Sequence, residues 1–511
     1  MAGMRYDVIV VGAGAAGAAL AARLTEDPSR SVLLLEAGAD YSIATLPPEL
    51  RSAESIANAV KTHDWGLRAV EHAEQRPTPL PRGKVTGGSS AVNGCVFLRG
   101  TPADYERWAA AGNDEWSWRK VLPYFRKLES DQNYADDLHG SDGPMPILRA
   151  HESTWVPFQR AMHDACRARG FAYDDDMNHP DSLGGVGPWP MNKIDGQRLS
   201  TAITYLEPIR QRLNLTIRAG VQARRLLFEG DRCIGLEVEA GGGVQQVRGA
   251  ETVLCAGAVM TPHLLLHSGV GPGAQLRRFG IEPRADLPVG RTLTDHASVL
   301  TLYRPCPGTI ADEVPFLQVG LRYTATGSDE PNDMQLVGFS RIRLDFSRAN
   351  AAGEGYGLMP ALEMPRSRGS ITLASSDPTD PPRIEMNQLA DPWDLERLRE
   401  GVRLAVELAA RSEFEGLIDS RYQPFHRDLE TDAALDAWIR ANVTTGHHTS
   451  ATCPRGPSGD PRAVVDQYGR VHSLRGLRAA DASIFPETPR ANTNATTIMV
   501  AERIADWMRS D

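Results

Sequence analysis

Apolar runs, glycines and a helical stretch follow one another closely at the start of the chain. Residues 7–11 are rich in β-branched side chains, which is typical of a buried parallel strand. A glycine-rich turn at residues 12–17 opens an Ala- and Leu-rich stretch that predicts a helix ending near Leu24. A second apolar run at residues 32–35 predicts another strand, which ends in Glu36. This order predicts a parallel sheet flanked by helices.

Later stretches predict two further groups of elements. Residues 215–221, 224–230 and 233–238 predict strands joined by turns, and residues 252–257 predict a parallel strand that returns to the first sheet. Residues 370–373 and 383–386 predict strands of a second domain. Residues 393–410 predict an amphipathic helix, because apolar residues recur on one broad face. These are Leu395, Leu398, Val402, Leu404 and Ala405.

Length and composition restrict the class of protein. The 511 residues are too many for one hydrophobic core and suggest about two to four units. With 41% hydrophobic and 23% charged residues, wholesale disorder is excluded. A net charge of −10 without basic runs makes nucleic acid or an anionic membrane a poor partner. The 47 glycines and 35 prolines favour a loop-rich α/β enzyme over a helical bundle.

The six cysteines are scattered, with no CxxC pair and no zinc-like spacing to histidine, so no metal site is expected. Sparse, unpatterned cysteines are typical of a reducing compartment. No window of about 18 apolar residues is present. The sequence therefore predicts a cytoplasmic location without a membrane span.

The first fifty residues also carry a dinucleotide-binding pattern. Gly12 suits the tight turn, Gly14 admits the pyrophosphate to the backbone, and Gly17 allows close packing of helix on strand. The pyrophosphate is then expected at a helix N-terminus, where free N–H groups favour an anion. Glu36 can accept from ribose hydroxyls and would repel a 2′-phosphate, which argues against NADP. The pattern leaves FAD and NAD open.

Several separated motifs then resemble one family. Residues 82–108 include Arg-Gly-Lys-Val-Thr-Gly-Gly-Ser-Ser-Ala-Val-Asn-Gly-Cys-Val-Phe, and residues 257–271 read Gly-Ala-Val-Met-Thr-Pro-His-Leu-Leu-Leu-His-Ser-Gly-Val-Gly. Residues 289–296, 448–453, 465–466, 477–486 and 492–494 add further blocks in order. Together they resemble the glucose–methanol–choline (GMC) oxidoreductases, of the bacterial alcohol oxidase or dehydrogenase type, over about residues 6–507.

The resemblance implies a fold of the α/β class with an α+β second domain. A Rossmann-like FAD-binding domain is expected from residues 1–110, 205–305 and 440–511. A substrate-binding domain, built on an antiparallel sheet with helices, is expected from residues 111–204 and 306–439. Stretches rich in Asp, Gly and Pro at residues 133–148 and 174–190 agree with this division.

The resemblance also implies FAD as the cofactor. Some members link it covalently through a histidine at the position of Val92, and valine has no nucleophile, so non-covalent binding is expected. The expected cofactor-binding residues are Gly12, Gly14, Ala15, Ala16, Gly17, Glu36, Ala37, Arg82, Val85, Gly87, Gly88, Ser89, Asn93, Gly94, Cys95, Val96, Val221, Ala256, Gly257, Asp481, Ala482, Asn492, Thr493, Asn494 and Thr496.

Two residues match the catalytic positions of the family. His448 matches the general base, and its titration range suits that role. Asn492 matches a position held by His or Asn; an amide can hold the substrate oxygen but cannot take a proton. The adjacent His447 is expected to point away from the flavin, because neighbours in an extended segment face opposite sides.

Other residues of these motifs are not expected to take part in catalysis. His296 and His472 are interpreted as structural. The chain has Arg455 where many members have Met, and a solvated or flavin-phosphate role is preferred for it over binding of a substrate anion. Four apolar residues are candidates for the substrate wall, with a place in the core preferred for each: Trp65, Trp189, Met334 and Phe339.

The expected reaction is oxidation of an alcohol, small or aromatic and primary, to the aldehyde. His448 would take the hydroxyl proton, hydride would pass to flavin N5, and O2 or another electron acceptor would complete the cycle. A lyase or photo-enzyme on the same scaffold, oxynitrilase-like or decarboxylase-like, is the alternative. The partners are expected to be a small-molecule alcohol and the electron acceptor, and the chain is expected to be a monomer or homodimer.

Overall fold

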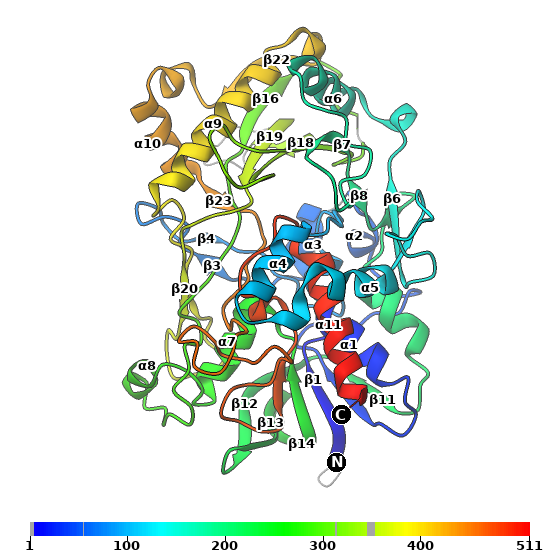
Figure 1. Cartoon of the computed structure of the whole chain (residues 1–511), viewed down its shortest axis with the longest axis vertical. Helices are drawn as coiled ribbons and strands as arrows, with labels where there is room; N and C mark the ends of the chain where they lie inside the picture. The colour runs from blue at the N-terminus through cyan, green and yellow to red at the C-terminus, as the bar shows by residue number, and fades with distance from the viewer. Residues whose placement is uncertain (1–4, 55, 312–313, 345–352, 511) are drawn as a thin grey trace.

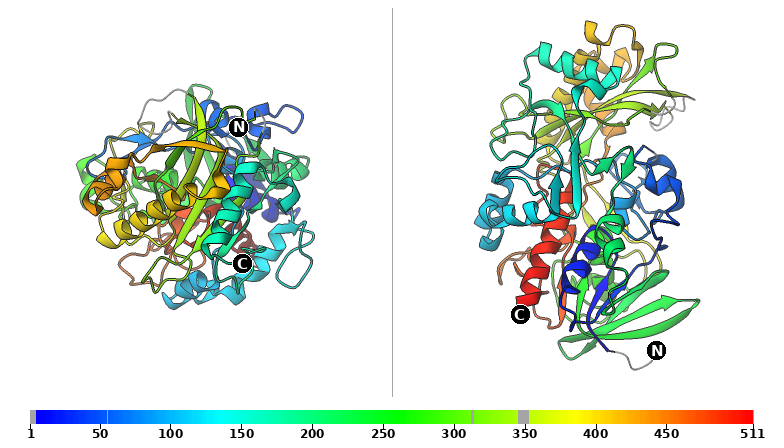
Figure 2. Two further views of the ribbon diagram at one scale, coloured as in Figure 1. Left: turned by 90° about the horizontal axis from the view of Figure 1, so that it is seen from above. Right: turned by 90° about the vertical axis from the view of Figure 1, so that its right-hand side faces the viewer.

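The computed structural model describes residues 5–54, 56–311, 314–344 and 353–510. Two large sheets lie at opposite ends of an elongated molecule (Figure 1). Turning the molecule by 90° about the vertical axis shows the same division into two parts, with the red C-terminal helix running from the middle down along the lower part (Figure 2). Both termini lie beside the lower sheet (Figure 1).

The lower sheet has seven strands in the order β11-β2-β1-β14-β13-β12, with β24 paired to β14. β14 joins two halves of the sheet, since it pairs in parallel with β1 and β24 and antiparallel with β13. The strands predicted at 7–11 and 32–35 are therefore confirmed, as are strands within 215–238, although the first of these lies beside β2. The strand predicted over 252–257 ends at Leu254, because a helix begins at Gly257. The bounds are β1 (Arg5–Val11), β2 (Val32–Leu35), β11 (Leu215–Arg218), β12 (Val221–Glu229), β13 (Arg232–Ala240), β14 (Gly243–Leu254) and β24 (Leu477–Ala479).

Helices from both ends of the chain cover this sheet. α1 (Ala15–Leu24) follows the glycine-rich turn, and α11 (Thr493–Ser510) packs along it. The guanidinium of Arg23 on α1 bonds the buried carboxylate of Glu502 on α11, with its Nε 2.7 Å from Oε2. Both helices are mostly buried and belong to one hydrophobic core with the strands. The core of the nucleotide-binding part is thus closed only when the two ends of the chain meet.

The upper sheet has eight strands, with the order β22-β16-β19-β18-β17-β7 and β15 joined to β19 and β23. α6 (Pro157–Arg169), α9 (Pro392–Ala409) and α10 (Asp432–Asn442) share a core with it, and α9 confirms the helix predicted over 393–410. The domain division drawn from the sequence stays a prediction. The strands are β7 (Gly185–Pro188), β15 (Ala297–Ser298), β16 (Thr301–Pro305), β17 (Val319–Tyr323), β18 (Met334–Arg343), β19 (Glu354–Leu362), β22 (Ile418–Gln423) and β23 (Thr444–Thr445).

The predicted strands at 370–373 and 383–386 form but do not join the upper sheet. They pair with each other, and Glu385 also forms an isolated bridge with Val70. Ile371 and Ile384 pack with Leu67 and Val259 beside the lower part. The remaining helices and strands are α2 (Pro48–Arg51), α3 (Ile56–Thr62), α4 (Pro102–Ala110), α5 (Trp118–Leu128), α7 (Gly257–His267), α8 (Gly273–Arg278), β3 (Arg68–Ala69), β4 (Thr78–Pro79), β5 (Glu129–Asp131), β6 (Met145–Arg149), β8 (Pro190–Met191), β9 (Lys193–Ile194), β10 (Gln197–Arg198), β20 (Ser370–Thr372) and β21 (Arg383–Glu385). Within the described ranges, no helix has both the length and the apolar character that crossing a bilayer requires.

Candidate active site

A cavity of about 1230 Å³ lies between the two sheets. One end is lined by the glycine-rich turn after β1 and by Glu36 after β2. The other end is lined by one face of β18 and β19 and by the segment that follows β23. The cavity therefore reaches from the nucleotide-binding motif to the predicted catalytic residues.

The glycines of the first motif make close backbone contacts that a side chain would block. Gly12 has φ +99°, and a Cβ atom there would lie 2.5 Å from the carbonyl oxygen of Cys255. A Cβ atom on Gly17 would lie 1.9 Å from the carbonyl oxygen of Gly12, so helix and turn touch at this point. Gly14 caps α1 without a side-chain hydrogen bond, and the first turn carries no acidic residue. The helix N-terminus therefore remains open to an anion.

Glu36 closes the same end of the cavity. Its carboxylate accepts hydrogen bonds from the backbone N–H groups of Ala13, at 3.0 Å, and Gly38, at 2.8 Å. Burial raises the pKa of Glu36 to about 7, although these N–H groups act in the opposite direction. The acid is thus fixed in place beside the turn that it follows in the sequence motif.

Most of the other predicted cofactor residues also line the cavity, but four do not: Gly17, Val85, Gly87 and Thr496. Thr496 is fully buried, with its hydroxyl 2.9 Å from that of Tyr105, and its neighbour Thr497 lines the cavity instead. Those that line it are Gly12, Gly14, Ala15, Ala16, Glu36, Ala37, Arg82, Gly88, Ser89, Asn93, Gly94, Cys95, Val96, Val221, Ala256, Gly257, Asp481, Ala482, Asn492, Thr493 and Asn494.

The two predicted catalytic residues meet at the inner end of the cavity. His448 follows β23, Asn492 immediately precedes α11, and the His448 Nε2 atom lies 3.0 Å from the Asn492 amide nitrogen. Burial, followed by the nearby His296 and His447, lowers the pKa of His448 well below 6.5. His448 is therefore neutral near pH 7, which is the form that accepts a proton.

His447 is also among the residues that line the cavity, and the extended backbone that was expected to turn its side chain away from the flavin is not present. Its φ of +67° is left-handed, and its backbone N–H bonds the hydroxyl of Thr445 at 2.8 Å. The segment is therefore a tight turn rather than an extended strand, and alternation of side chains does not apply to it.

Asp295 fixes this turn from the neighbouring segment. One carboxylate oxygen accepts the backbone N–H of His448 at 2.7 Å, and the other accepts the hydroxyl of Thr445. Burial raises the pKa of Asp295 to about 6, and the guanidinium of Arg82 counteracts this. Arg82 also bonds the hydroxyl of Thr449 at 2.7 Å. The base thus sits on a backbone held at several points.

His296, which the sequence motif led us to interpret as structural, contacts His448 directly. Its Nδ1 atom lies 2.8 Å from Nδ1 of His448 and 3.1 Å from Oε2 of Glu363. Glu363 follows β19, is fully buried and lines the cavity. Sequence reasoning missed Glu363 because it lies outside every recognised motif. The only available signal was its position at the end of a strand of the second domain.

The upper sheet supplies the outer wall of the cavity through alternate residues. Gln335, Val337 and Phe339 on β18, and Met359 and Ala361 on β19, face the cavity. The residues between them face the core that the sheet shares with α6 and α9, as period-two alternation requires. Of the apolar candidates, Trp65, Trp189 and Phe339 line the cavity, and Trp189 and Phe339 also belong to a hydrophobic core cluster. Met334 does not line the cavity, because it is fully buried on the opposite face of β18.

Arg455 lies away from the cavity. Its guanidinium carbon lies 3.7 Å from the ring centroid of Trp116 and 4.2 Å from that of Trp108. The side chain is buried, so neither a solvated role nor contact with a flavin phosphate applies. His472 is structural, as expected, with Nε2 3.1 Å from the carbonyl oxygen of Gly456.

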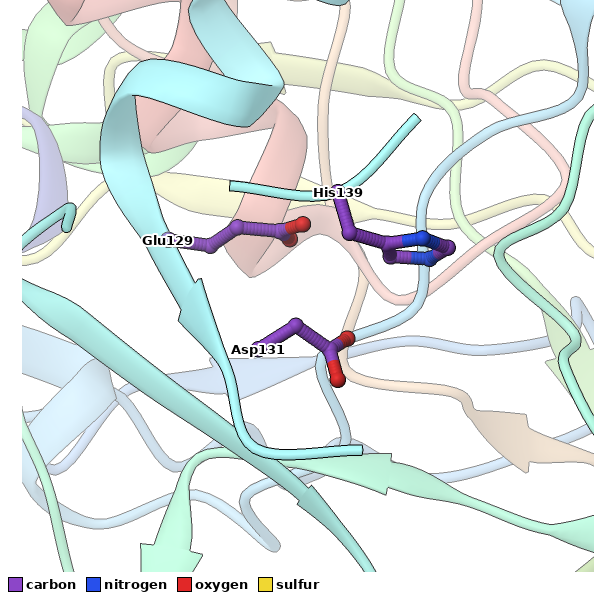
Figure 3. A group of neighbouring side chains, drawn as sticks. All are labelled: Glu129, Asp131 and His139. Carbon is purple, nitrogen blue, oxygen red and sulfur yellow. The ribbon is translucent and has the colours of Figure 1, made fainter. Parts of the chain in front are cut away.

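Within the described residues, one group of side chains has the spacing of metal ligands: Glu129, Asp131 and His139 (Figure 3). Each already has a charged partner. Arg99 pairs with Glu129, Arg149 lies 2.7 Å from Asp131, and both ring nitrogens of His139 face further carboxylates. These pairs compensate the buried charges without an ion.

The residues that line the cavity fit FAD. The open N-terminus of α1 and the bare backbone at Gly14 and Gly88 suit a pyrophosphate. At the other end, buried side-chain atoms without a hydrogen-bond partner among the described residues, Oδ1 of Asn492 and Nδ2 of Asn494, belong to residues that line the cavity. Such atoms offer an acceptor and a donor to a polar ring edge or a substrate. Val92 also lines the cavity and brings no nucleophile.

Comparisons with known proteins agree with this arrangement. Two GMC oxidoreductase family models match residues 6–298 and 365–501. An uncharacterised GMC-type oxidoreductase in the thcA 5′ region of Rhodococcus erythropolis is 37% identical over 99% of this chain and 98% of its own length. The oxygen-dependent choline dehydrogenase of Photobacterium profundum is 36% identical over 98% of this chain and 92% of its own length.

A solved structure extends the comparison to the fold. Pyridoxine 4-oxidase from Mesorbium loti superposes with a TM-score of 0.91 at 31% identity, over 99% of this chain and all of that one. The chain belongs to the GMC oxidoreductase family. It is an FAD-dependent oxidoreductase of the class that acts on CH–OH groups, with a Rossmann-type cofactor-binding part, as its sequence motifs predicted.

Proposed function

We propose that the protein oxidises a primary alcohol, small or aromatic, to the aldehyde, with His448 as the base. The observation that carries this proposal is the pairing of a neutral His448 with Asn492, 3.0 Å apart at the inner end of the cavity. When bound, FAD supplies the acceptor for the hydride that leaves the alcohol carbon. His448 takes the hydroxyl proton at Nε2, and the Asn492 amide holds the oxygen in reach.

The wall beside these residues supports an apolar substrate. Val337, Phe339 and Met359 present carbon surface, and the rings of Phe316 and Phe339 lie 4.9 Å apart. An aromatic ring can pack against such a pair. The cavity end near His296 and Glu363 is polar, which supports a substrate orientation with the reacting hydroxymethyl group at that end and the apolar part of the alcohol along the sheet.

The proposal further includes non-covalent FAD, O2 or another carrier as the electron acceptor, and the cofactor-binding roles of the cavity-lining residues named above. Val92 supports non-covalent binding because valine cannot form the bond. Denaturation in trichloroacetic acid tests it: the yellow cofactor is expected to stay in the supernatant. Flavin retained in the protein pellet would contradict it.

Anaerobic mixing with a panel of small, aromatic and quaternary-ammonium alcohols tests the reaction. We expect an aromatic primary alcohol to bleach the flavin absorbance and the His448→Ala variant to bleach at least about 100-fold more slowly. His472→Ala removes a histidine outside the cavity and serves as the control. If His448→Ala bleaches the flavin at the wild-type rate, His448 is not the base. Cyanohydrin cleavage without bleaching would replace the oxidation with a lyase. Admitting oxygen and measuring peroxide then separates oxidase from dehydrogenase.

A further inference from the structure

Two histidines from segments far apart in the chain share a hydrogen bond through the same type of ring nitrogen. The Nδ1 atoms of His296 and His448 lie 2.8 Å apart, and the ring planes meet at 74°. Two unprotonated nitrogens would repel at this distance, and two protonated ones would clash. One proton therefore lies between them, and one of the two rings must accept.

The backbone decides which ring accepts. Nε2 of His296 lies 3.1 Å from the carbonyl oxygen of Pro489, and a carbonyl can only accept, so this nitrogen carries hydrogen. Burial lowers the pKa of His296 to about 4, although hydrogen bonds to the backbone of Pro489 and of Glu363 act in the opposite direction, so the ring is neutral near pH 7 and holds a single proton. Its Nδ1 is then bare and accepts the hydrogen bond.

The proton between the rings must consequently belong to Nδ1 of His448. We propose that His296 is a positioning residue that holds His448 in the Nδ1-protonated tautomer and so leaves the Nε2 lone pair for the substrate hydroxyl. Asn492 agrees independently, because its amide nitrogen lies 3.0 Å from Nε2 and can donate only to a bare nitrogen; the substrate hydroxyl would take the place of this donor at Nε2. Each of the three hydrogen bonds that connect the Pro489 carbonyl, His296, His448 and Asn492 in sequence then has one donor and one acceptor.

Glu363 has a matching requirement. Its Oε2 atom lies 3.1 Å from Nδ1 of His296 but has no hydrogen-bond partner among the described residues, so it does not compete with His448 for that nitrogen. An ionised carboxylate there would draw a proton onto that nitrogen, and His448 would have to accept at Nδ1 and carry its own proton on Nε2. The base would then be lost. Full burial raises the pKa of Glu363 well above its usual value, which keeps the acid neutral and the productive tautomer in place.

The inference rests on the proposed role of His448, but its first test does not need turnover. Protein labelled with ¹⁵N-histidine and loaded with FAD is examined by long-range ¹H–¹⁵N spectroscopy, with His448→Ala used to assign the signals. We expect His448 to carry its proton on Nδ1 in the wild type and in Glu363→Gln, which is neutral at every pH. We expect the preference to be lost in His296→Leu. A wild-type proton on Nε2 would overturn the proposal.

Kinetics provides the second test. Without an acceptor at Nδ1, His296→Leu is expected to slow anaerobic flavin reduction by about 100-fold with a substrate Kd close to wild type. His296→Asn places an amide oxygen near the lost Nδ1 and is expected to stay within about threefold of wild type. His472→Asn, the change of another histidine bonded to a carbonyl, controls for loss of a histidine in general. Equal rates in the Leu and Asn variants would overturn the proposal.

The outcomes remain separable from those of the proposed function. If no alcohol bleaches the wild-type flavin, the proposed reaction fails while the spectroscopic test of the tautomer still stands. If the wild type bleaches and His448→Ala does not, but His296→Leu behaves like the wild type, only the positioning role fails. Should His296→Leu not fold, the wild-type spectrum and His296→Asn still decide the question.

Discussion

The backbones of Gly14 and Gly88 touch: a Cβ atom on Gly88 would lie 2.7 Å from the Cα atom of Gly14. Two motifs separated by more than seventy residues therefore meet without side chains between them, beside the open N-terminus of α1. This contact holds the second glycine-rich segment against the nucleotide-binding turn.

Gly88→Ala is consequently expected to lower both thermal stability and FAD content. The new methyl group meets backbone that cannot move aside, in addition to the strain of φ +52°. Gly230→Ala separates the two effects, because Gly230 has φ +61° and nothing within 4 Å. We expect Gly230→Ala to lower the free energy of unfolding by about 1 kcal/mol and to leave the FAD content unchanged. The ratio of flavin to protein absorbance, together with the melting temperature, checks both; equal losses in the two variants would argue against the contact.

Arg455 is expected to lower the stability of the folded protein. Its guanidinium stacks on Trp116, but none of its three nitrogens has a hydrogen-bond partner among the described residues, and burial lowers its pKa well below the usual value. Arg455→Met should therefore keep or raise the melting temperature, by up to several degrees, since an uncompensated buried charge disappears. Arg503→Met is the matched change, because Arg503 bonds Glu115 at 2.9 Å and should destabilise when removed. If Arg455→Met lowers the melting temperature as much as Arg503→Met does, the stacking of Arg455 on the tryptophans stabilises the protein more than the unpaired buried charge destabilises it.

Substrate size is expected to depend on alternate residues of β18. Val337→Phe narrows the cavity, so kcat/KM for ring-bearing alcohols should fall by about tenfold or more relative to a small alcohol. Leu336→Met changes the adjacent residue, which is fully buried on the opposite face, and should leave the ratio unchanged. Steady-state rates with a matched pair of alcohols measure both. A shifted ratio in Leu336→Met alone would contradict the assignment of faces.

His139 should make stability depend on pH. Burial alone would lower its pKa, but hydrogen bonds to Asp176 and Asp136 raise it above 6.5 overall. A raised pKa contributes stability that is complete below the unfolded value and is lost as pH rises through the folded one. The melting-temperature gap between wild type and His139→Gln should therefore be widest near about pH 6 and narrow toward about pH 9. The exposed His426→Gln change should show no such trend.

Chelators should not affect the cluster of Glu129, Asp131 and His139. Arg99 and Arg149 already pair with the carboxylates that would ligate an ion. Incubation with EDTA is expected to leave the melting temperature and the flavin absorbance unchanged. A fall in melting temperature that Zn²⁺ or Ca²⁺ restores would establish a metal site at Glu129, Asp131 and His139 after all.

Local patterns were sufficient for the nucleotide-binding end. The β1–α1–β2 order and Glu36 follow from periodicity and glycine spacing over a few dozen residues, and the structure confirms these elements. His448 and Asn492 were located by motif, and they meet. What failed depended on backbone geometry: the left-handed φ of His447 removes the alternation that was assumed for it.

Contacts between distant segments could not be predicted. His296 and Glu363 come from segments that are brought to His448 only by the pairing of β15 with β19 and β23, and no local signal marks that pairing. Met334 lies in the core, the place preferred for it, whereas Phe339 lines the cavity; the phase of β18 relative to the cavity decides between the two positions and is set by the fold. Arg455 is similar, since the tryptophans that enclose it lie hundreds of residues earlier.

The closing of the lower sheet by the end of the chain has a consequence for biosynthesis. β24 and α11 leave the ribosome after α1 and after the other strands of the lower sheet, yet β24 pairs with the parallel half of β14 and α11 buries one side of α1. Until then, a nascent chain carries an uncovered strand edge and an apolar helix face, both of which favour aggregation. Chains that terminate before residue 477 lack both elements, so they are expected to aggregate or to be degraded.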